Sequence, residues 1–103
     1  LRILRDTKEE RSIRDSIVKK IMKGMHMSKL EAIETMQIFK SIFSSNLDVA
    51  SHIAVFLELG DKEIEFLTED KEKVGKIKGK MLSIHRKLKE VKTELEVKVE
   101  DYI

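Results

Sequence analysis

The chain has 103 residues, a formal net charge of +2 and 39 % charged residues, with no Cys and no Pro. This length limits it to one domain with a modest core, and the absence of Cys excludes disulfides, thiolate chemistry and Cys-based zinc sites. Charged residues interrupt every apolar run before the roughly 18 residues of a membrane span, so we expect a cytoplasmic protein that does not bind membranes. The first residue is Leu1, which favours a segment excised from a longer protein.

Lys and Glu are abundant, whereas Asn46 is the only Asn and Gln37 the only Gln. Enrichment in Lys and Glu with few thermolabile residues is typical of thermophiles. An AT-rich genome produces the same bias, so both explanations stay open.

Capping signals predict two helices near the start of the chain. A Ser or Thr followed three residues later by Glu is a capping box, and it occurs twice: Thr7 with Glu10, and Ser28 with Glu31. We expect a first helix over about residues 7–26, with Gly24 helping the chain to leave it. The second helix is predicted to end at the polar run 44–46, because short polar side chains compete for backbone hydrogen bonds.

The segment 47–59 is the most apolar of the chain. It is predicted to be a short central helix, buried as plain core, with Gly60 as its C-terminal cap. Residues 1–60 would therefore form three core helices.

Residues 61–103 are predicted to form one long C-terminal interaction helix, with a possible break where Thr68 caps a restart. Some 35 to 40 helical residues would span roughly 55–60 Å, which is more than a small bundle can cover. Its free end therefore needs a fold-back or a partner.

Apolar residues in this helix recur at alternating spacings of three and four, which is a coiled-coil heptad. The seam consists of Val74, Met81, Leu88 and Leu95 at heptad position a, and Ile77, Ile84 and Val91 at d. The flanking e and g positions are nearly all Lys or His, and only Glu94 breaks the sign. Like-charge contacts disfavour a parallel homodimer. The acidic blocks 58–70 and 94–101 are better matches, so antiparallel or ring-like self-assembly, or a helical partner with an acidic face, is expected.

The same helix has nine basic and two acidic residues in 71–92, a net charge of +7. Its basic residues are Lys71, Lys73, Lys76, Lys78, Lys80, Arg86, Lys87, Lys89 and Lys92. About five of them facing one polyanion would give a log–log salt slope of about −4.5 on duplex DNA. No exposed aromatic accompanies them for base stacking, so the pattern supports sequence-independent binding of nucleic acid and no specific readout.

Short alternations of apolar and polar residues at 63–67 and 95–100, and at the N-terminus, are typical of strands. An α+β fold with a small sheet built from the terminal and 63–67 segments is therefore the alternative fold.

No reaction chemistry stands out. The glycine pair Gly75 and Gly79 has three intervening residues, and Met81 follows Lys80, so the Walker spacing is not met. The three His residues lack metal-ligand spacing. We expect no catalytic residue, cofactor, metal or small-molecule substrate, and hence no enzyme.

The sequence thus predicts an all-α fold: a single helical domain of three core helices plus a long coiled-coil-like C-terminal helix. Its expected function is a non-enzymatic assembly or adaptor module that acts through the seam. The alternative function is polyanion binding through the lysine block.

Overall fold

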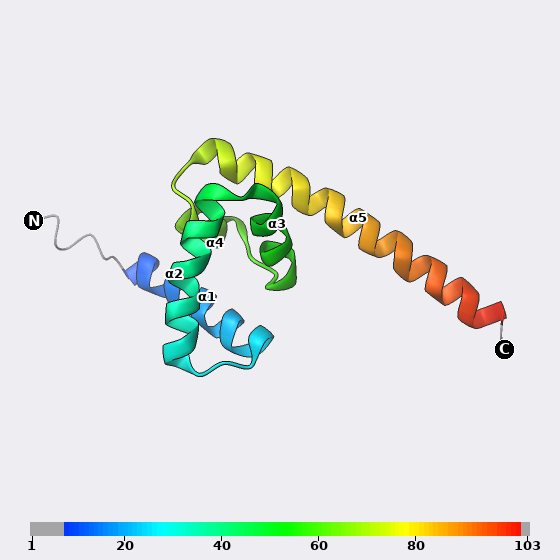
Figure 1. Ribbon diagram of the computed structural model, residues 1–103, viewed down its shortest axis with the longest axis horizontal. Coiled ribbons are helices and arrows are strands. Elements are labelled where there is room, and N and C mark those ends of the chain that lie inside the picture. Colours follow the sequence, from blue (N-terminus) through cyan, green and yellow to red (C-terminus); the bar gives the residue numbers. More distant parts are fainter. Residues whose placement is uncertain (1–7, 102–103) are drawn as a thin grey trace, which may run out of the picture.

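The computed structural model describes the backbone of residues 8–101 and the side chains of residues 8–96. Within that range the protein is all-α, as predicted, and contains α1 (Lys8–Met25), α2 (Lys29–Ser45), α3 (Leu47–Phe56), α4 (Asp61–Leu67) and α5 (Lys71–Asp101). The first four helices form a bundle, and α5 starts on top of it and projects far beyond it (Figure 1). The molecule is accordingly elongated, with extents of 65 × 32 × 21 Å.

The core lies where all five helices meet. Its largest fully buried apolar side chains come from four of them: Ile17 and Ile21 of α1, Met36 and Phe43 of α2, Ile64 of α4 and Ile77 of α5. Fully buried Ala50 and Ala54 line the inner side of α3. Small side chains there allow α3 to pack closely between α2 and α5.

The helix boundaries follow local chemistry. The capping box of Ser28 and Glu31 is present, with the Ser28 Oγ accepting a hydrogen bond from the Glu31 N–H at 3.3 Å. Asn46 both ends α2 and caps α3, because its Oδ1 accepts from the Val49 N–H at 3.2 Å. The predicted cap at Thr7 and the apolar residues before it lie outside the described residues.

The chain leaves α1 and α3 through left-handed residues other than glycine. His26 has φ 53° and Glu58 has φ 55°. The prediction that Gly60 caps the C-terminus of the central helix is therefore wrong. Gly60 precedes α4 with φ −87°, and its N–H donates to the Glu63 Oε1 at 2.8 Å.

Gly24 has a packing role instead of the predicted role in ending the helix. A Cβ at this position would lie 3.0 Å from Leu57 Cδ2 and 3.4 Å from Phe56 Cε2. The missing side chain thus lets the end of α3 approach α1.

The single helix predicted from residue 61 onward is divided at the position where a break was suspected. α4 ends at Leu67, and α5 begins at Lys71. The cap is Asp70 and not Thr68: the Asp70 Oδ1 accepts from the Glu72 N–H at 3.0 Å. Because Ile64 and Leu67 are buried, α4 belongs to the core, which the prediction had confined to residues 1–60.

The alternative α+β fold is not formed in the described residues. Segment 63–67 lies in α4 and segment 95–100 in α5. The cap at Asp70 starts a helix that continues through the second segment. The N-terminal segment lies outside the described residues.

Candidate interaction surface

The apolar seam of α5 is divided into two halves by the bundle. Val74 and Ile77 are buried in the core, Met81 packs against it, and Ile84 is partly buried. We call these four residues the packed half of the seam. The free half consists of Leu88, Val91 and Leu95, which are 56, 51 and 58 % exposed.

The free half of α5 is helical without support from the bundle. Residues 85–101 are rich in Lys and Glu and contain no Gly, a composition that favours helix. Isolated helices of this length are nevertheless marginal in water, and most helix stability in proteins comes from packing of an apolar face. A helix with three large exposed side chains on one stripe is therefore suited to gain stability from a second helix.

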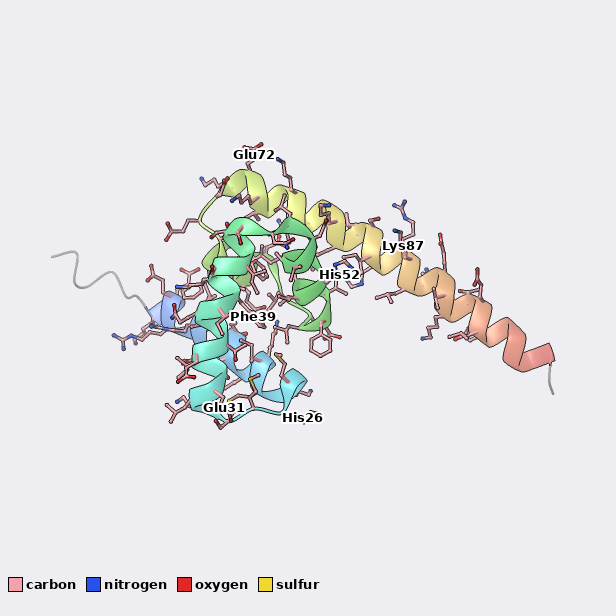
Figure 2. The ribbon with its side chains drawn as sticks, in the orientation of Figure 1. His26, Glu31, Phe39, His52, Glu72 and Lys87 are labelled. Atoms are coloured by element: carbon pink, nitrogen blue, oxygen red, sulfur yellow. The ribbon has the colours of Figure 1, made fainter. Side chains whose placement is uncertain are left out.

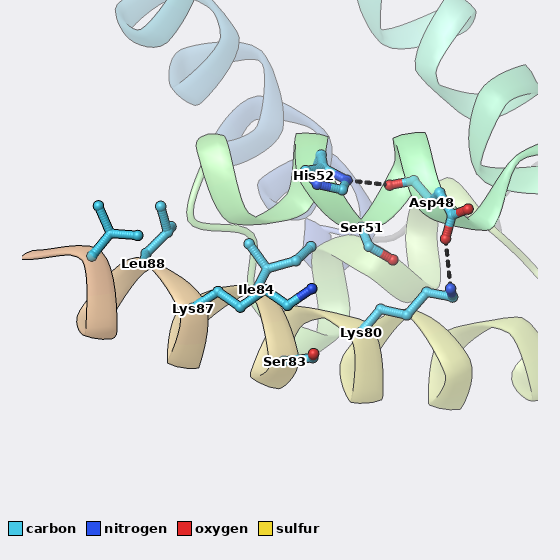
Figure 3. Close-up of a pocket in the computed structure, with 9 residues that line it drawn as sticks. Asp48, Ser51, His52, Lys80, Ser83, Ile84, Lys87 and Leu88 are labelled. Atoms are coloured by element: carbon cyan, nitrogen blue, oxygen red, sulfur yellow. Dashed lines mark hydrogen bonds and ion pairs between the residues drawn. The ribbon is translucent and has the colours of Figure 1, made fainter.

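A groove of about 380 Å³ lies between α3 and α5, and Figure 3 shows the side chains that line it. We call it the α3–α5 groove. α3 contributes Asp48, Ser51 and His52, whereas α5 contributes Lys80, Ser83, Ile84, Lys87, Leu88 and Val91. The groove thus extends the free half of the seam toward the bundle.

Polar contacts hold the walls of this groove. Lys80 Nζ donates to the Asp48 Oδ1 at 2.5 Å and bridges α5 to α3. The hydrogen bond and the charge of Lys80 hold the pKa of Asp48 below its ordinary value. His52 Nδ1 lies 2.7 Å from the backbone oxygen of Asp48, and its ring stands beside α5 (Figure 2).

A second groove, of about 480 Å³, lies on the other side of α3. We call it the outer groove. It is lined almost entirely by apolar side chains from three helices: Met25, Phe39, Val49, Ile53, Phe56 and Leu57, with Asp48 and His52 at its border. Phe56 is 64 % exposed, so the prediction that residues 47–59 are plain core is wrong for this side of α3.

The lysine block is partly neutralised within the chain. Lys76 pairs with Glu72, Lys78 with Asp61 and Lys80 with Asp48, while Lys73 donates to the Ser44 backbone oxygen. Asp61 belongs to the acidic block 58–70, so unlike blocks do meet inside one molecule, whereas Asp48 lies outside both acidic blocks. Six cations of the block make no ion pair within the described residues: Lys71, Lys73, Arg86, Lys87, Lys89 and Lys92.

One buried ionic cluster was missed by the sequence analysis. Glu63 of α4 is 7 % exposed; it accepts from Lys20 Nζ at 2.5 Å and from Ser16 Oγ at 2.7 Å, both on α1. Burial raises the pKa of Glu63, but hydrogen bonds from Gly60, Lys20 and Ser16 outweigh it, so that pKa lies below its ordinary value. The available signal was the spacing of Gly60 and Glu63, which lets the Glu63 carboxylate accept a hydrogen bond from the Gly60 N–H at the start of α4.

Among the side chains of residues 8–96, no three His, Asp or Glu lie close enough together to hold a metal ion. None of the helices described is both long and apolar enough to cross a membrane. The geometry defines a small helical bundle with one projecting amphipathic helix, half covered by the bundle and half open.

We compared the sequence of this helical chain with those of known proteins. The chain is similar to the large subunit of replication factor C: it is 66 % identical to the protein of Pyrococcus horikoshii over 90 residues, or 87 % of this chain and 19 % of that protein. The Thermococcus kodakarensis protein is 54 % identical over 86 % of this chain and 18 % of its own length. The Methanopyrus kandleri protein is 33 % identical over 91 % of this chain and 20 % of its own length.

The chain thus spans about a fifth of the length of the curated relatives that it matches. No family model and no solved structure matches it. Pyrococcus and Thermococcus are thermophilic archaea, which favours the thermophile explanation of the Lys and Glu content. The relatives are named as subunits, and this fits an assembly role for a helical module.

Proposed function

We propose that this chain is a non-enzymatic assembly module of a replication factor C large subunit, and that it binds a helix of another protein chain through the free half of the α5 seam. The observation that carries the proposal is the exposure of Leu88, Val91 and Leu95 on one stripe of a projecting helix. Exposed apolar patches of this kind mark protein interaction sites. The relatives' name supports it, because a subunit must contact other chains.

Charge sets the kind of partner. Lys87 and Lys92 flank the free half of the seam and have no ion-pair partner among the described residues, so an acidic helical face is the expected complement. The partner is either a second copy or another subunit. The proposal goes with the cytoplasmic location expected from the sequence.

A substitution in the free half of the seam tests this function. Leu88→Asp, made in the longer protein that contains this segment, is expected to weaken binding of the other replication factor C subunits at least tenfold. The reason is that a carboxylate would be desolvated in the interface without a partner. Titration of the purified subunits, followed by light scattering, measures the effect.

Leu82→Asp is the matched control. Leu82 is 68 % exposed on the same helix but lies at heptad position b, away from the seam. We expect it to leave assembly unchanged. Equal losses for the two substitutions, or no loss for Leu88→Asp, would contradict the proposed function.

The second candidate function is sequence-independent binding of nucleic acid. What favours it is the exposed group Arg86, Lys87, Lys89 and Lys92 on α5; Figure 2 labels Lys87. Three of the other five basic residues pair with acidic residues of the chain itself, which lowers the number of phosphates that the block can neutralise together. The relatives' name describes a subunit and says nothing of nucleic acid. Assembly is therefore the better supported function.

A further inference from the structure

The outer groove differs in character from the free half of the seam. Its lining consists almost entirely of apolar side chains from α1, α2 and α3, and three of them are strongly exposed: Phe56 by 64 %, Val49 by 42 % and Met25 by 39 %. Soluble proteins rarely leave a contiguous apolar surface uncovered unless something binds there. The outer groove therefore needs an occupant.

The lining of the outer groove is held in place by the bundle. Phe56 lies against Gly24 of α1, since a Cβ at Gly24 would be 3.4 Å from Phe56 Cε2. This contact supports one edge of the ring while most of the ring stays exposed. Phe39 also lines the groove, and it is only 7 % exposed and belongs to the core. An occupant thus meets an apolar surface that is already formed.

Polar groups at the outer groove are few and largely engaged. Asp48 and His52 stand at its border. Asp48 accepts from Lys80 Nζ at 2.5 Å, and His52 Nδ1 lies 2.7 Å from the backbone oxygen of Asp48. Small-molecule sites orient their ligand through a few well-placed polar groups, and contacts between separate proteins draw specificity from complementary charge. The outer groove offers little of either, so its expected occupant is an uncharged apolar surface.

The rest of a longer subunit can supply such a surface. This chain spans about a fifth of the length of its curated relatives, so most of a protein of that length lies outside it. Surfaces that stay together permanently are more apolar than those that meet transiently, and they resemble a core cut in half. α3 fits this description: it packs on α2 and α5, and its side toward the outer groove is apolar and open.

We propose that the outer groove is the docking site for an apolar helix face from the same polypeptide, in the part of the longer protein outside these 103 residues. The occupant carries no charge where it contacts Phe56 and Val49. The outer groove joins this module to the rest of its own subunit, whereas the free half of the seam faces other chains. The inference goes beyond the proposed function, because it concerns a different surface and a different partner.

Thiol labelling at the outer groove tests what covers it. Val49→Cys keeps a small side chain at the groove, and the 103-residue chain has no other Cys. The rate of modification at position 49, located by peptide mass spectrometry, is measured in three samples: this chain, the purified longer subunit, and the longer subunit with the other replication factor C subunits. We expect the rate to fall about tenfold or more from the chain to the longer subunit, because a covered thiol is inaccessible to the reagent. Adding the other subunits should change it no further.

Glu69→Cys is the control for this labelling. Glu69 is exposed and does not line the outer groove, so a thiol at position 69 should react at the same rate in all three samples. Equal rates at position 49 in the chain and the longer subunit would overturn the proposal. Protection that appears only after the other subunits are added would overturn it as well, because the occupant would then be another chain.

The proposed function is tested separately. Leu88→Asp alters the free half of the seam and leaves the outer groove unchanged, since Leu88 does not line it. A failure of the labelling prediction therefore leaves the seam as the assembly surface, and a failure of the Leu88→Asp prediction leaves the outer groove as an internal contact of the subunit.

Discussion

Glu63 shows how one carboxylate can connect two helices and a turn. It caps α4 through the Gly60 N–H and contacts Ser16 and Lys20 of α1. Lys20 Nζ also donates to the backbone oxygen of Glu58 at 2.9 Å, the residue that ends α3 in a left-handed conformation. These hydrogen bonds thus hold the turn between α3 and α4 against α1. The residues that form them are far apart in the sequence, so no local pattern predicts the contacts.

The charge of Glu63 is expected to stabilise the fold at neutral pH. Glu63→Gln removes it with little change of shape, so we expect a loss of about 1–3 kcal/mol in the free energy of unfolding at pH 7. Because the pKa of Glu63 is lowered in the folded protein, its stabilisation is present above the ordinary Glu pKa and is lost as pH falls through the folded value. Urea unfolding at a series of pH values should show the two proteins converging in acid.

Glu69→Gln is the control for this comparison, since Glu69 is exposed and its side chain makes no described contact. It should unfold like the unchanged protein at every pH. A difference between Glu63→Gln and the unchanged protein that persists at low pH would contradict the role of charge.

The glycines of α1 and α5 differ in the space available for an added side chain. No atom lies within 4 Å of a Cβ placed at Gly75 or Gly79, whereas a Cβ at Gly24 meets Leu57 and Phe56. Gly75→Ala and Gly79→Ala are therefore expected to raise the free energy of unfolding by about 0.5–1 kcal/mol each, the usual difference between Gly and Ala inside a helix. Gly24→Ala should gain less or destabilise, because Leu57 must move. Thermal unfolding of the three variants measures the contrast, and a destabilised Gly75→Ala would mean that the outer face of α5 is packed.

Helices were the part of the fold that could be predicted from the sequence, because caps and apolar spacing are local. The break after α4 was located only approximately, since both Thr68 and Asp70 are good caps and only tertiary packing decides between them. Thr68 is 3 % exposed and fixed in the core, which leaves Asp70 to cap α5.

The candidate surface was predictable in part for the same reason. The seam follows from periodicity, but the boundary between its packed and free halves depends on where α3 ends and diverges from α5. The groove at that boundary is lined by residues such as His52 and Ile84, which are far apart in the sequence. The exposure of Phe56 could not be predicted either, because a helix with apolar residues on all its faces is expected to be buried on every side.

At the scale of the whole molecule, the bundle buries none of the described side chains in the free half of α5. The buried residues of α5 are Val74 and Ile77, and beyond Ile84 every described side chain of the helix is exposed. Helix propensity alone keeps a free segment of this length only marginally ordered. The bundle should therefore fold without it, whereas the segment should need a partner for its full stability.

Truncation after Arg86 tests this division. The shortened chain is expected to keep the thermal midpoint of the bundle within about 5 °C, a shift that corresponds to roughly 1 kcal/mol in a domain of this size, because no buried side chain is removed. Circular dichroism melts of both chains measure the shift. A large fall in the midpoint of the shortened chain at low concentration would show that the projecting half of α5 supports the bundle directly, and the two parts could then no longer be treated as independent.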